Sequence, residues 1–454
     1  MPVTLTKDLE VMLSNPKVAI LSMAAPLFVS YLITNLQTFA DSFWCSGLGP
    51  DAMAAVSISA PMYGIIVNIG SGLGVGASAA IARSLGAGNK KRADSLASQV
   101  IMIILLISIS LSIFLLICLK PLLGLMGGGE VMDYCMAYAL PLVLFTFPLM
   151  MNHVVIGLLR SEGAAKRSMV LSILAAVLNL ILDPVMIYGL NMGILGASLS
   201  TVTSYGIMIS VGFYWYLKKK LYVNISFKGF HFIWEQIKDI FVVGVPRALE
   251  LVVVSLLIIP QNVLVLICGG TEGMITYYYP LKFTALVAVS ALSISAAMVP
   301  VTSAAIGQND FEKAKVGFKY SFKMAVVIAS IMAVVIFVLA DPLTSVFCHT
   351  PETAHLHAEM TKALRIYTIF IPCSACVSIS SGILQSLRLA QMSTVVMLIR
   401  ELVLLGLLFI ASTISMDAVY WSLTIALVLG GLMMIKCARF GIKRTERKLI
   451  LSGA

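Results

Sequence analysis

The sequence predicts an all-α membrane protein with twelve transmembrane helices in two six-helix lobes, related by pseudo-two-fold symmetry along the membrane normal. Three observations lead to this fold class. The 454 residues are 59% hydrophobic and 11% charged, with a mean hydropathy of +0.99, whereas soluble domains carry about 25% charged residues. Apolar runs of roughly 20 residues, long enough to cross a bilayer, recur along the whole chain. The two halves of the chain also share short motifs in the same order.

Each apolar run is interpreted as one membrane-spanning helix, because roughly 20 helical residues match a hydrocarbon core of about 30 Å. In chain order the predicted spans are 18–44, 53–82, 95–119, 132–158, 168–190, 194–217, 246–267, 274–305, 317–341, 361–386, 393–413 and 418–437.

A degenerate repeat places six spans in each half. The matching stretches are GLGPDAM (47–53) with CGGTEGM (268–274), GAGNKKRA (86–93) with GQNDFEKA (307–314), and GLLRSEGAA (157–165) with GILQSLRLA (382–390). An even number of spans per half means that both halves enter the membrane from the same side. Parallel repeats of this kind are typical of transporters, whose substrate sites lie between the halves.

The repeat also sets the predicted domain boundaries. We expect an amino-terminal lobe over residues 1–217 and a carboxy-terminal lobe over 245–454, which ends in a basic cytoplasmic tail. Between them, residues 218–244 are predicted to form a cytoplasmic or interfacial linker. It begins with three lysines and contains the amphipathic stretch HFIWEQIKDIF, which we expect to lie at the membrane surface as a short helix.

The net charge of +10 indicates orientation rather than nucleic-acid binding. Most of the 31 lysines and arginines fall in connections that share one side of the membrane, so the positive-inside rule places both termini in the cytoplasm of a multi-pass protein in the cell (plasma or inner) membrane. These clusters lack the interleaved aromatic residues of a nucleic-acid groove. The expected partners are membrane lipid and small organic substrates, and the protein is expected to act as a monomer.

The sequence offers no support for an enzyme. It has no H-E-x-x-H zinc motif and no G-x-S-x-G elbow. The eight cysteines lie in or beside apolar runs and are interpreted as small buried hydrophobes. Cys373 and Cys376 form a C-x-x-C pair without a histidine at metal spacing. We therefore expect no cofactor beyond a coupling ion.

An acid inside a predicted span is the first candidate for function. Asp183 lies in LNLILDPVMIYG (178–189), with Asn179 one turn before it and Pro184 after it. A charged Asp at the centre of a membrane helix costs about 2.5–3.5 kcal/mol, so it is rarely idle. Asn179 lies on the same helix face, and a proline frees carbonyl oxygens nearby. Such an oxygen-rich spot suits a proton or a small hard cation.

A second acid, Asp41, ends a polar stripe on the first span. Thr34, Gln37, Thr38 and Asp41 recur at helical spacing, so they are predicted to face the lobe interior or a water-filled cavity. The alternative is that Asp41 marks the outer end of its helix. The hydroxyls of Ser200 and Thr201, in GASLSTVTS (196–204), are a further contributor.

The two halves differ in the polar residues that they carry at matching positions of the repeat. Asp41 matches Asn262, whereas Asn179 and Asp183 match Leu404 and Leu408. The acid pair therefore exists only in the first half, although a purely structural role would more naturally appear in both.

The second half carries ionisable residues of its own: Arg247, Glu250, Lys282, Arg400 and Glu401. One interpretation is mutual ion pairing that holds the lobe together. The other is a polar cavity wall that contacts anionic or zwitterionic substrate groups. The residues predicted to line a substrate cavity are Thr34, Gln37, Thr38, Asn152, Glu250 and Lys282.

Several of these stretches together resemble the multidrug and toxic compound extrusion (MATE) transporters over essentially the whole chain, and the DinF-like and archaeal branch in particular. The stretches are Pro26 with Asp41 and GLGPDAM, ARSLGAGNKKRA, LLRSEGAAKR and NLILDPVMIYGLNMGILGASLST. The resemblance implies a V-shaped pair of lobes and efflux of amphipathic, often cationic compounds against inward H⁺ or Na⁺. It also implies that Asp41, Asn179, Asp183 and Thr201 form the cation site, holding H⁺ or Na⁺. The tenth span lacks the acid of the sodium-coupled NorM-like branch.

The leading functional hypothesis is therefore a cation-coupled multidrug exporter. The alternative is a flippase or exporter of a lipid-linked or anionic precursor, in which Arg247, Lys282 and Arg400 line a basic cavity. The two acids of the first half weigh against this alternative, because a flippase of anions needs cations there.

Overall fold

The computed structural model describes residues 5–345, 348 and 354–451, and the regular structure in these residues is helical. The helices are α1 Lys7–Leu13, α2 Pro16–Ser46, α3 Pro50–Gly86, α4 Lys90–Leu125, α5 Met132–Leu144, α6 Thr146–Ser161, α7 Ala165–Pro184, η1 Val185–Gly189, α8 Ile194–Leu217, α9 Trp234–Gly307, α10 Phe311–Val338, α11 Ala340–Ser345, η2 Ala354–Leu356, α12 His357–Thr368, α13 Ile371–Ser386, α14 Ala390–Ala411 and α15 Met416–Leu451.

The helices account for the twelve predicted spans. Within the described residues, nine helices are long and apolar enough to cross a membrane, and two bent pairs, α5–α6 and α12–α13, raise this to eleven. The 74 residues of α9 would extend ~110 Å as one helix, far beyond a hydrocarbon core of about 30 Å. Its backbone breaks at Gly270, which has φ +60°, so α9 supplies two spans. The predicted fold class is confirmed.

Proline explains both bent spans. The helices α5 and α6 meet at Phe145 with a 53° bend, and α12 and α13 meet with a 43° bend. Pro148, in the first turn of α6, and Pro372, at the start of α13, lack the N–H that would continue the preceding helix. The sequence patterns over 132–158 and 361–386 predicted each pair as one span, and hydrophobicity alone does not report a bend.

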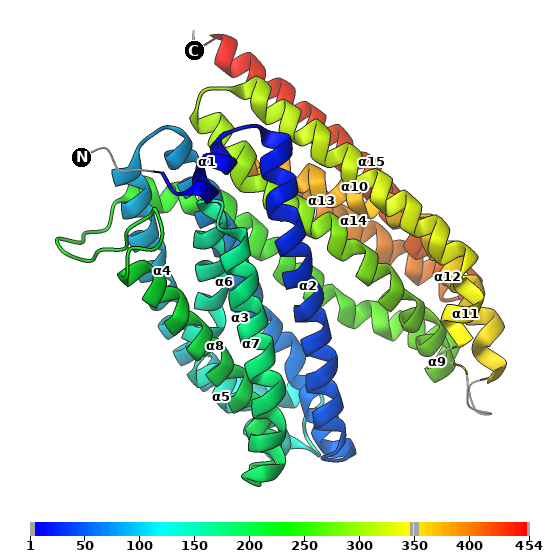
Figure 1. Cartoon of the computed structure of the whole chain (residues 1–454). Helices are drawn as coiled ribbons and strands as arrows, with labels where there is room; N and C mark the ends of the chain where they lie inside the picture. Colours follow the sequence, from blue (N-terminus) through cyan, green and yellow to red (C-terminus); the bar gives the residue numbers. More distant parts are fainter. Residues whose placement is uncertain (1–4, 346–347, 349–353, 452–454) are drawn as a thin grey trace.

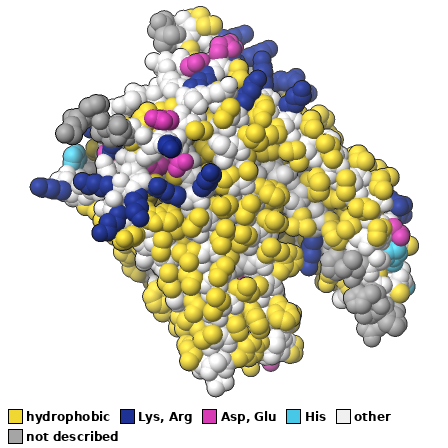
Figure 2. Space-filling view, viewed as in Figure 1, with side chains coloured by type: hydrophobic (Ala, Val, Ile, Leu, Met, Phe, Trp, Pro, Cys, Tyr) yellow, Lys and Arg dark blue, Asp and Glu magenta, His cyan; other side chains and the backbone are white. Residues whose placement is uncertain are grey.

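The two lobes form a V. Helices α2–α8 lie on one side and α9–α15 on the other; they approach each other at the end of the molecule where both chain ends lie, and diverge toward the opposite end (Figure 1). The space-filling view shows a notch between the lobes on the side away from the termini (Figure 2).

Direct backbone packing joins the lobes along α3 and α9. A Cβ on Gly76 would collide with the backbone of Ile240 and Gly244, so only glycine permits this approach. Farther from the termini, the Asn68 amide of α3 donates to the Leu251 carbonyl at 3.3 Å and to Ser255 Oγ at 3.0 Å on α9. The lobes thus share hydrogen bonds as well as apolar contacts.

A cluster of charges closes the same end of the V. Asp239 of α9 is buried and pairs with Arg83 at 3.0 Å, Arg92 at 3.3 Å and Arg388 at 3.1 Å. Arg83 also donates to the Ser386 carbonyl at 3.1 Å. Because Arg83 and Arg92 belong to the first lobe and Arg388 to the second, we call these four charged residues the Asp239 cluster, and it links the lobes.

The surface supports a membrane location. Large apolar side chains are exposed at helical spacing, for example Leu106, Ile109, Ile113, Phe114 and Ile117 along α4. Figure 2 shows hydrophobic side chains over most of the visible face, while lysine and arginine gather at the end that holds the termini. This pattern is expected for a lipid-facing belt with one basic edge.

One feature of the linker differs from the prediction. The stretch HFIWEQIKDIF does not form a separate surface helix, because α9 begins within it at Trp234 and continues without a break into the membrane span. No helix-breaking residue separates the two parts before Pro246, and a proline near the start of a span kinks a helix without ending it.

Candidate functional site

Three helices bring the predicted cation-site residues together. Asp41 lies near the end of α2, Asn179 and Asp183 lie near the end of α7, and Thr201 lies in the second turn of α8. Asn179 and Asp183 are buried. Because the three helix ends lie away from the termini, the site occupies the outer half of the first lobe if the termini are cytoplasmic.

Asn179 is the centre of the hydrogen bonds in this site. Its amide nitrogen lies 3.4 Å from Asp183 Oδ1, 3.3 Å from Ser200 Oγ and 3.4 Å from Thr201 Oγ1. Ser200 also donates to Asp183 Oδ1. The i−4 spacing predicted the contact between Asn179 and Asp183, and Ser200 is a further member of the site.

The two acids contact each other. Asp41 and Asp183 lie within side-chain hydrogen-bonding range. Asp41 Oδ1 and Asn179 Oδ1 are buried and have no hydrogen-bond partner among the described residues. Two adjacent carboxylates resist being ionised together, and buried oxygens without partners are costly. The arrangement therefore favours a bound proton or cation between these oxygens.

Three tyrosines surround the acid pair. Tyr63 and Tyr205 lie close enough to interact with each other, and Tyr205 also lies near Gln37. Tyr138 lies close enough to interact electrostatically with Asp41 and Asp183. Sequence reasoning missed all three tyrosines, although Tyr205 lies one helical turn after Thr201 and therefore on its face.

The helix changes form directly after Asp183. Residues Val185–Gly189 form a π-helix, η1, that follows Pro184. The Tyr188 hydroxyl donates to the Trp44 carbonyl at 2.6 Å, which ties η1 to the end of α2. Short π-helical segments are frequent at functional sites, and proline prevents the Leu180 carbonyl from forming its usual helical bond.

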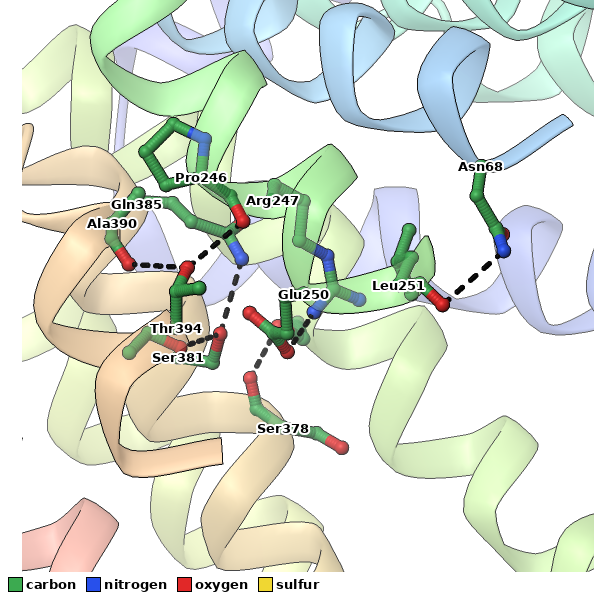
Figure 3. Close-up of polar contacts among 12 residues, drawn as sticks. Asn68, Pro246, Arg247, Glu250, Leu251, Ser378, Ser381, Gln385, Ala390 and Thr394 are labelled. Carbon is green, nitrogen blue, oxygen red and sulfur yellow. Dashed lines mark hydrogen bonds and ion pairs between the residues drawn. The ribbon is translucent and has the colours of Figure 1, made fainter. Parts of the chain in front are cut away.

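A cavity of about 350 Å³ lies between the lobes, separate from the acid pair. Its wall includes Tyr31 of α2, Arg160 of α6, Arg247 and Glu250 of α9, and Arg400 of α14. Figure 3 shows the α9 side of this wall, with Arg247 and Glu250 beside Ser378, Ser381 and Gln385 of α13. We call this space the inter-lobe cavity.

Four charged residues of the second lobe form two ion pairs, and three of the four, Arg247, Glu250 and Arg400, line the cavity. Arg247 donates to Glu250 at 2.5 Å, and Arg400 pairs with Glu401. Gln261 donates to the other Glu401 oxygen at 3.0 Å. Ion pairing and a polar cavity wall, offered above as alternatives, are thus both present.

The residues predicted for a substrate cavity do not form one surface. Glu250 lines the inter-lobe cavity, but the other five are not part of its wall. Thr34 and Thr38 are exposed and donate to carbonyls of their own helix. Asn152 is buried and donates to Leu149.

Lys282 lies elsewhere, on the part of α9 that follows the break at Gly270. Its exposed ammonium group sits 4.5 Å from the Tyr279 ring centroid and 5.8 Å from that of Phe39. Because Phe39 belongs to α2, Lys282 approaches the opposite lobe through a cation–π contact.

No group of three or more His, Cys, Asp or Glu side chains that could hold a metal occurs in residues 5–345, 348 and 354–451. All eight cysteines have free thiols.

Comparisons with known proteins agree with this architecture. The family model MatE matches residues 26–185 and 246–410. The chain is 27% identical to an FAD transporter of Shewanella oneidensis over 387 residues, which cover 81% of each chain. It is 21% identical to the multidrug export protein MepA of Staphylococcus saprophyticus over 406 residues, which cover 89% of each chain.

A solved structure shares the fold throughout. It is an outward-facing multidrug resistance MATE family transporter of the MOP superfamily, with a TM-score of 0.93 and 28% sequence identity. The match covers 98% of this chain and 100% of the other.

Proposed function

Because the chain belongs to the MatE family of membrane transporters, we propose that it is a secondary active exporter of small amphipathic organic compounds, coupled to inward movement of H⁺ or Na⁺ at the acid pair. The observation that carries this proposal is the contact between Asp41 and Asp183. A buried pair of carboxylates is stable only with a proton or cation, and it can release one.

The other site residues have defined roles in this proposal. Asn179 and Thr201 provide oxygen ligands for Na⁺, or polar groups around a proton, and Ser200 orients Asp183. Gln37 and the tyrosines hold the ring of helices around the acids. All of these groups can bind either ion, and separate pH and Na⁺ gradients distinguish H⁺ from Na⁺ coupling.

Coupling requires that the ion changes the relative stability of two conformations. In the proposed cycle, an ion from the outside neutralises the acid pair while the V is open outward. Neutralisation removes the repulsion between α2 and α7, and α7 can repack at Pro184 and η1. The repacked lobe disfavours bound substrate, which leaves to the outside before the lobes reverse.

The relatives support transport of organic compounds, and their names give different cargoes. One is named for multidrug export and another for transport of FAD. The resemblance to MATE transporters implies amphipathic, often cationic substrates. The second candidate, export of an anionic precursor, is supported by one observation: Arg160, Arg247 and Arg400 all line the inter-lobe cavity.

Reconstituted transport tests the proposal. A pH gradient and a Na⁺ gradient are imposed separately on proteoliposomes that contain the purified protein. One of the two gradients should drive accumulation of an amphipathic dye, either cationic or anionic. Ionophores that collapse the effective gradient should abolish the accumulation. Downhill movement that ignores both gradients would refute ion coupling.

A further inference from the structure

The inter-lobe cavity carries an excess of positive charge from both lobes. Its wall contains three guanidinium groups, Arg160 from the first lobe and Arg247 and Arg400 from the second, but a single carboxylate, Glu250. Glu401, which pairs with Arg400, does not belong to the wall. A ligand inside this space therefore meets more cationic than anionic groups.

Arg160 differs from the other two arginines. Its guanidinium donates to the Tyr31 hydroxyl at 3.3 Å and lies 5.5 Å from the Tyr31 ring centroid. No ion pair with an acid is recorded for it within the described residues. His153, which also lines the cavity, is close enough to interact electrostatically with Arg160, and the effect is repulsive when the histidine is charged.

Two buried donors face no protein acceptor. Arg160 Nε and Arg400 Nε are buried and have no hydrogen-bond partner in the described part of the chain. Buried N–H groups are nearly always paired in folded proteins, so each exception needs an explanation. Guanidinium groups are suited to planar or tetrahedral oxyanions, which they bind through several charge-assisted hydrogen bonds.

The rest of the wall suits an amphipathic molecule. Leu251, Val254, Leu292, Val377 and Leu427 supply apolar surface. The volume of about 350 Å³ lies within the range of small-molecule sites, about 300–1,000 Å³. The cavity thus combines an apolar wall with a few convergent polar groups.

We propose that the inter-lobe cavity is a binding site for an oxyanion, a carboxylate or a phosphate group, on an amphipathic substrate. The oxyanion lies between Arg160 of the first lobe and Arg400 of the second, while Arg247 remains paired with Glu250. This inference rests on the proposed function and deepens it, because it names the substrate class. A ligand held by arginines of both lobes also binds more tightly to conformations in which these arginines lie close together than to conformations in which the lobes are separated.

Binding to the resting protein tests this proposal without any ion gradient. Isothermal titration in nanodiscs, with empty nanodiscs subtracted, compares four probes with the same short tail: octyl phosphate, octanoate, octyltrimethylammonium and octyl glucoside. The two anions separate a phosphate from a carboxylate preference, and the cation and the neutral glucoside report binding by the apolar wall alone. Octyl phosphate or octanoate should bind at least about tenfold more tightly than either of the other probes.

Three variants assign the binding to the cavity. Arg160→Gln should weaken binding of the anion about tenfold or more. Glu250→Gln should leave that binding unchanged or strengthen it, because it removes the one carboxylate of the wall. Arg444→Gln, at an exposed position of α15, is the matched control and should bind as the wild type does.

Arg400 needs a paired change, because removing it alone would leave Glu401 buried and unpaired. The double variant Arg400→Gln/Glu401→Gln removes both charges and should weaken binding as Arg160→Gln does. Size-exclusion profiles and melting temperatures report whether each variant is folded, and Arg160→Lys keeps the charge if Arg160→Gln is unstable.

The opposite results would overturn the proposal. Tighter binding of octyltrimethylammonium, lost in Glu250→Gln, would make the cavity a cation site. Equal binding of all four probes, unchanged in every variant, would mean that the arginines contact no ligand. Neither result bears on ion coupling, because transport driven by a gradient is measured separately and depends on the acid pair.

Discussion

At the scale of single residues, the protein uses buried charge in two different ways. The acid pair, Asp41 and Asp183, shares an environment with buried oxygens that lack partners. Glu162, at the end of α6, instead has hydrogen-bond donors for both of its carboxylate oxygens. It accepts from the Tyr216 hydroxyl at 3.1 Å and from the Tyr222 and Val223 amides at 2.7 and 3.3 Å. The first arrangement can exchange an ion, and the second anchors the linker to the lobe.

The anchor at Glu162 should depend on pH. Burial raises the pKa of Glu162 from its ordinary 4.5 to about 7. Its contribution to folding stability is therefore complete below about pH 4.5 and is lost as the pH rises through 7. Between pH 5 and pH 8 the free energy of unfolding of the wild type should decrease by at most about 3 kcal/mol. This decrease should be measured as a lower melting temperature at pH 8.

The matched variant is Glu162→Gln, which keeps an oxygen acceptor but cannot ionise. Its melting temperature should vary less over the same pH range. The control Glu235→Gln changes an exposed glutamate and should follow the wild-type curve. Identical pH profiles for wild type and Glu162→Gln would show that Glu162 does not titrate in this range.

The sequence predicted the site of Asp183, but it did not predict the position of Arg160 in the inter-lobe cavity. Asn179 and Asp183 lie four residues apart on one helix, so their contact follows from periodicity. Arg160 belongs to the stretch LLRSEGAAKR, and charge patterning did not single it out as a cavity residue. Its contact with Tyr31 depends on how α6 is rotated against α2, which no local pattern encodes.

At the scale of helices, span lengths were predictable and their breaks were not. The length of an apolar run is a local property of the sequence, and the twelve spans could therefore be predicted from it. The bends at α5–α6 and α12–α13 and the π-helix η1 depend on how neighbouring helices satisfy the backbone groups that proline leaves free.

The crossing of α3 and α9 can be tested with one methyl group. A Cβ on Gly86 would collide with the backbone of Ala304, so Gly86→Ala should force the helices apart. We expect a loss of about 1–3 kcal/mol of stability, measured as a lower melting temperature. Gly206→Ala on α8 is the control, because a Cβ there meets no atom within 4 Å. Equal melting temperatures for the two variants would contradict the close approach.

At the scale of the whole molecule, orientation is the first property to establish. Single cysteines in residues 189–193 should react with an impermeant reagent from outside intact cells, in a background without native cysteines. Cysteines in residues 86–91 should react only after the membrane is permeabilised. Reversed labelling would place the termini outside and the acid pair on the inner side.

The Asp239 cluster should control the balance between outward-open and inward-open states. Asp239→Asn removes the charge that Arg83, Arg92 and Arg388 share, so their mutual repulsion should separate the lobes at the end with the termini. Spin labels at Lys91 and Lys443, one on each lobe, should show a longer average distance in this variant.

Glu235→Gln is the control for that measurement, because Glu235 is exposed and pairs with Arg92 alone among the described contacts. Its distance distribution should match that of the wild type. If Asp239→Asn leaves the distance unchanged, the Asp239 cluster stabilises the fold without acting on the lobe equilibrium.

The most direct test of the central claim is gradient-driven transport by Asp183→Asn in proteoliposomes, beside the control Asp51→Asn at an exposed acid. Asparagine imitates the neutral acid but cannot release a proton. Asp183→Asn should fold and insert normally, keep downhill transport, and lose at least about tenfold of the gradient-driven accumulation. Asp41→Asn should behave alike, and the double variant should be little worse than either single variant, because the acids act as one unit. Accumulation by Asp183→Asn at the wild-type rate under an imposed gradient would contradict the account.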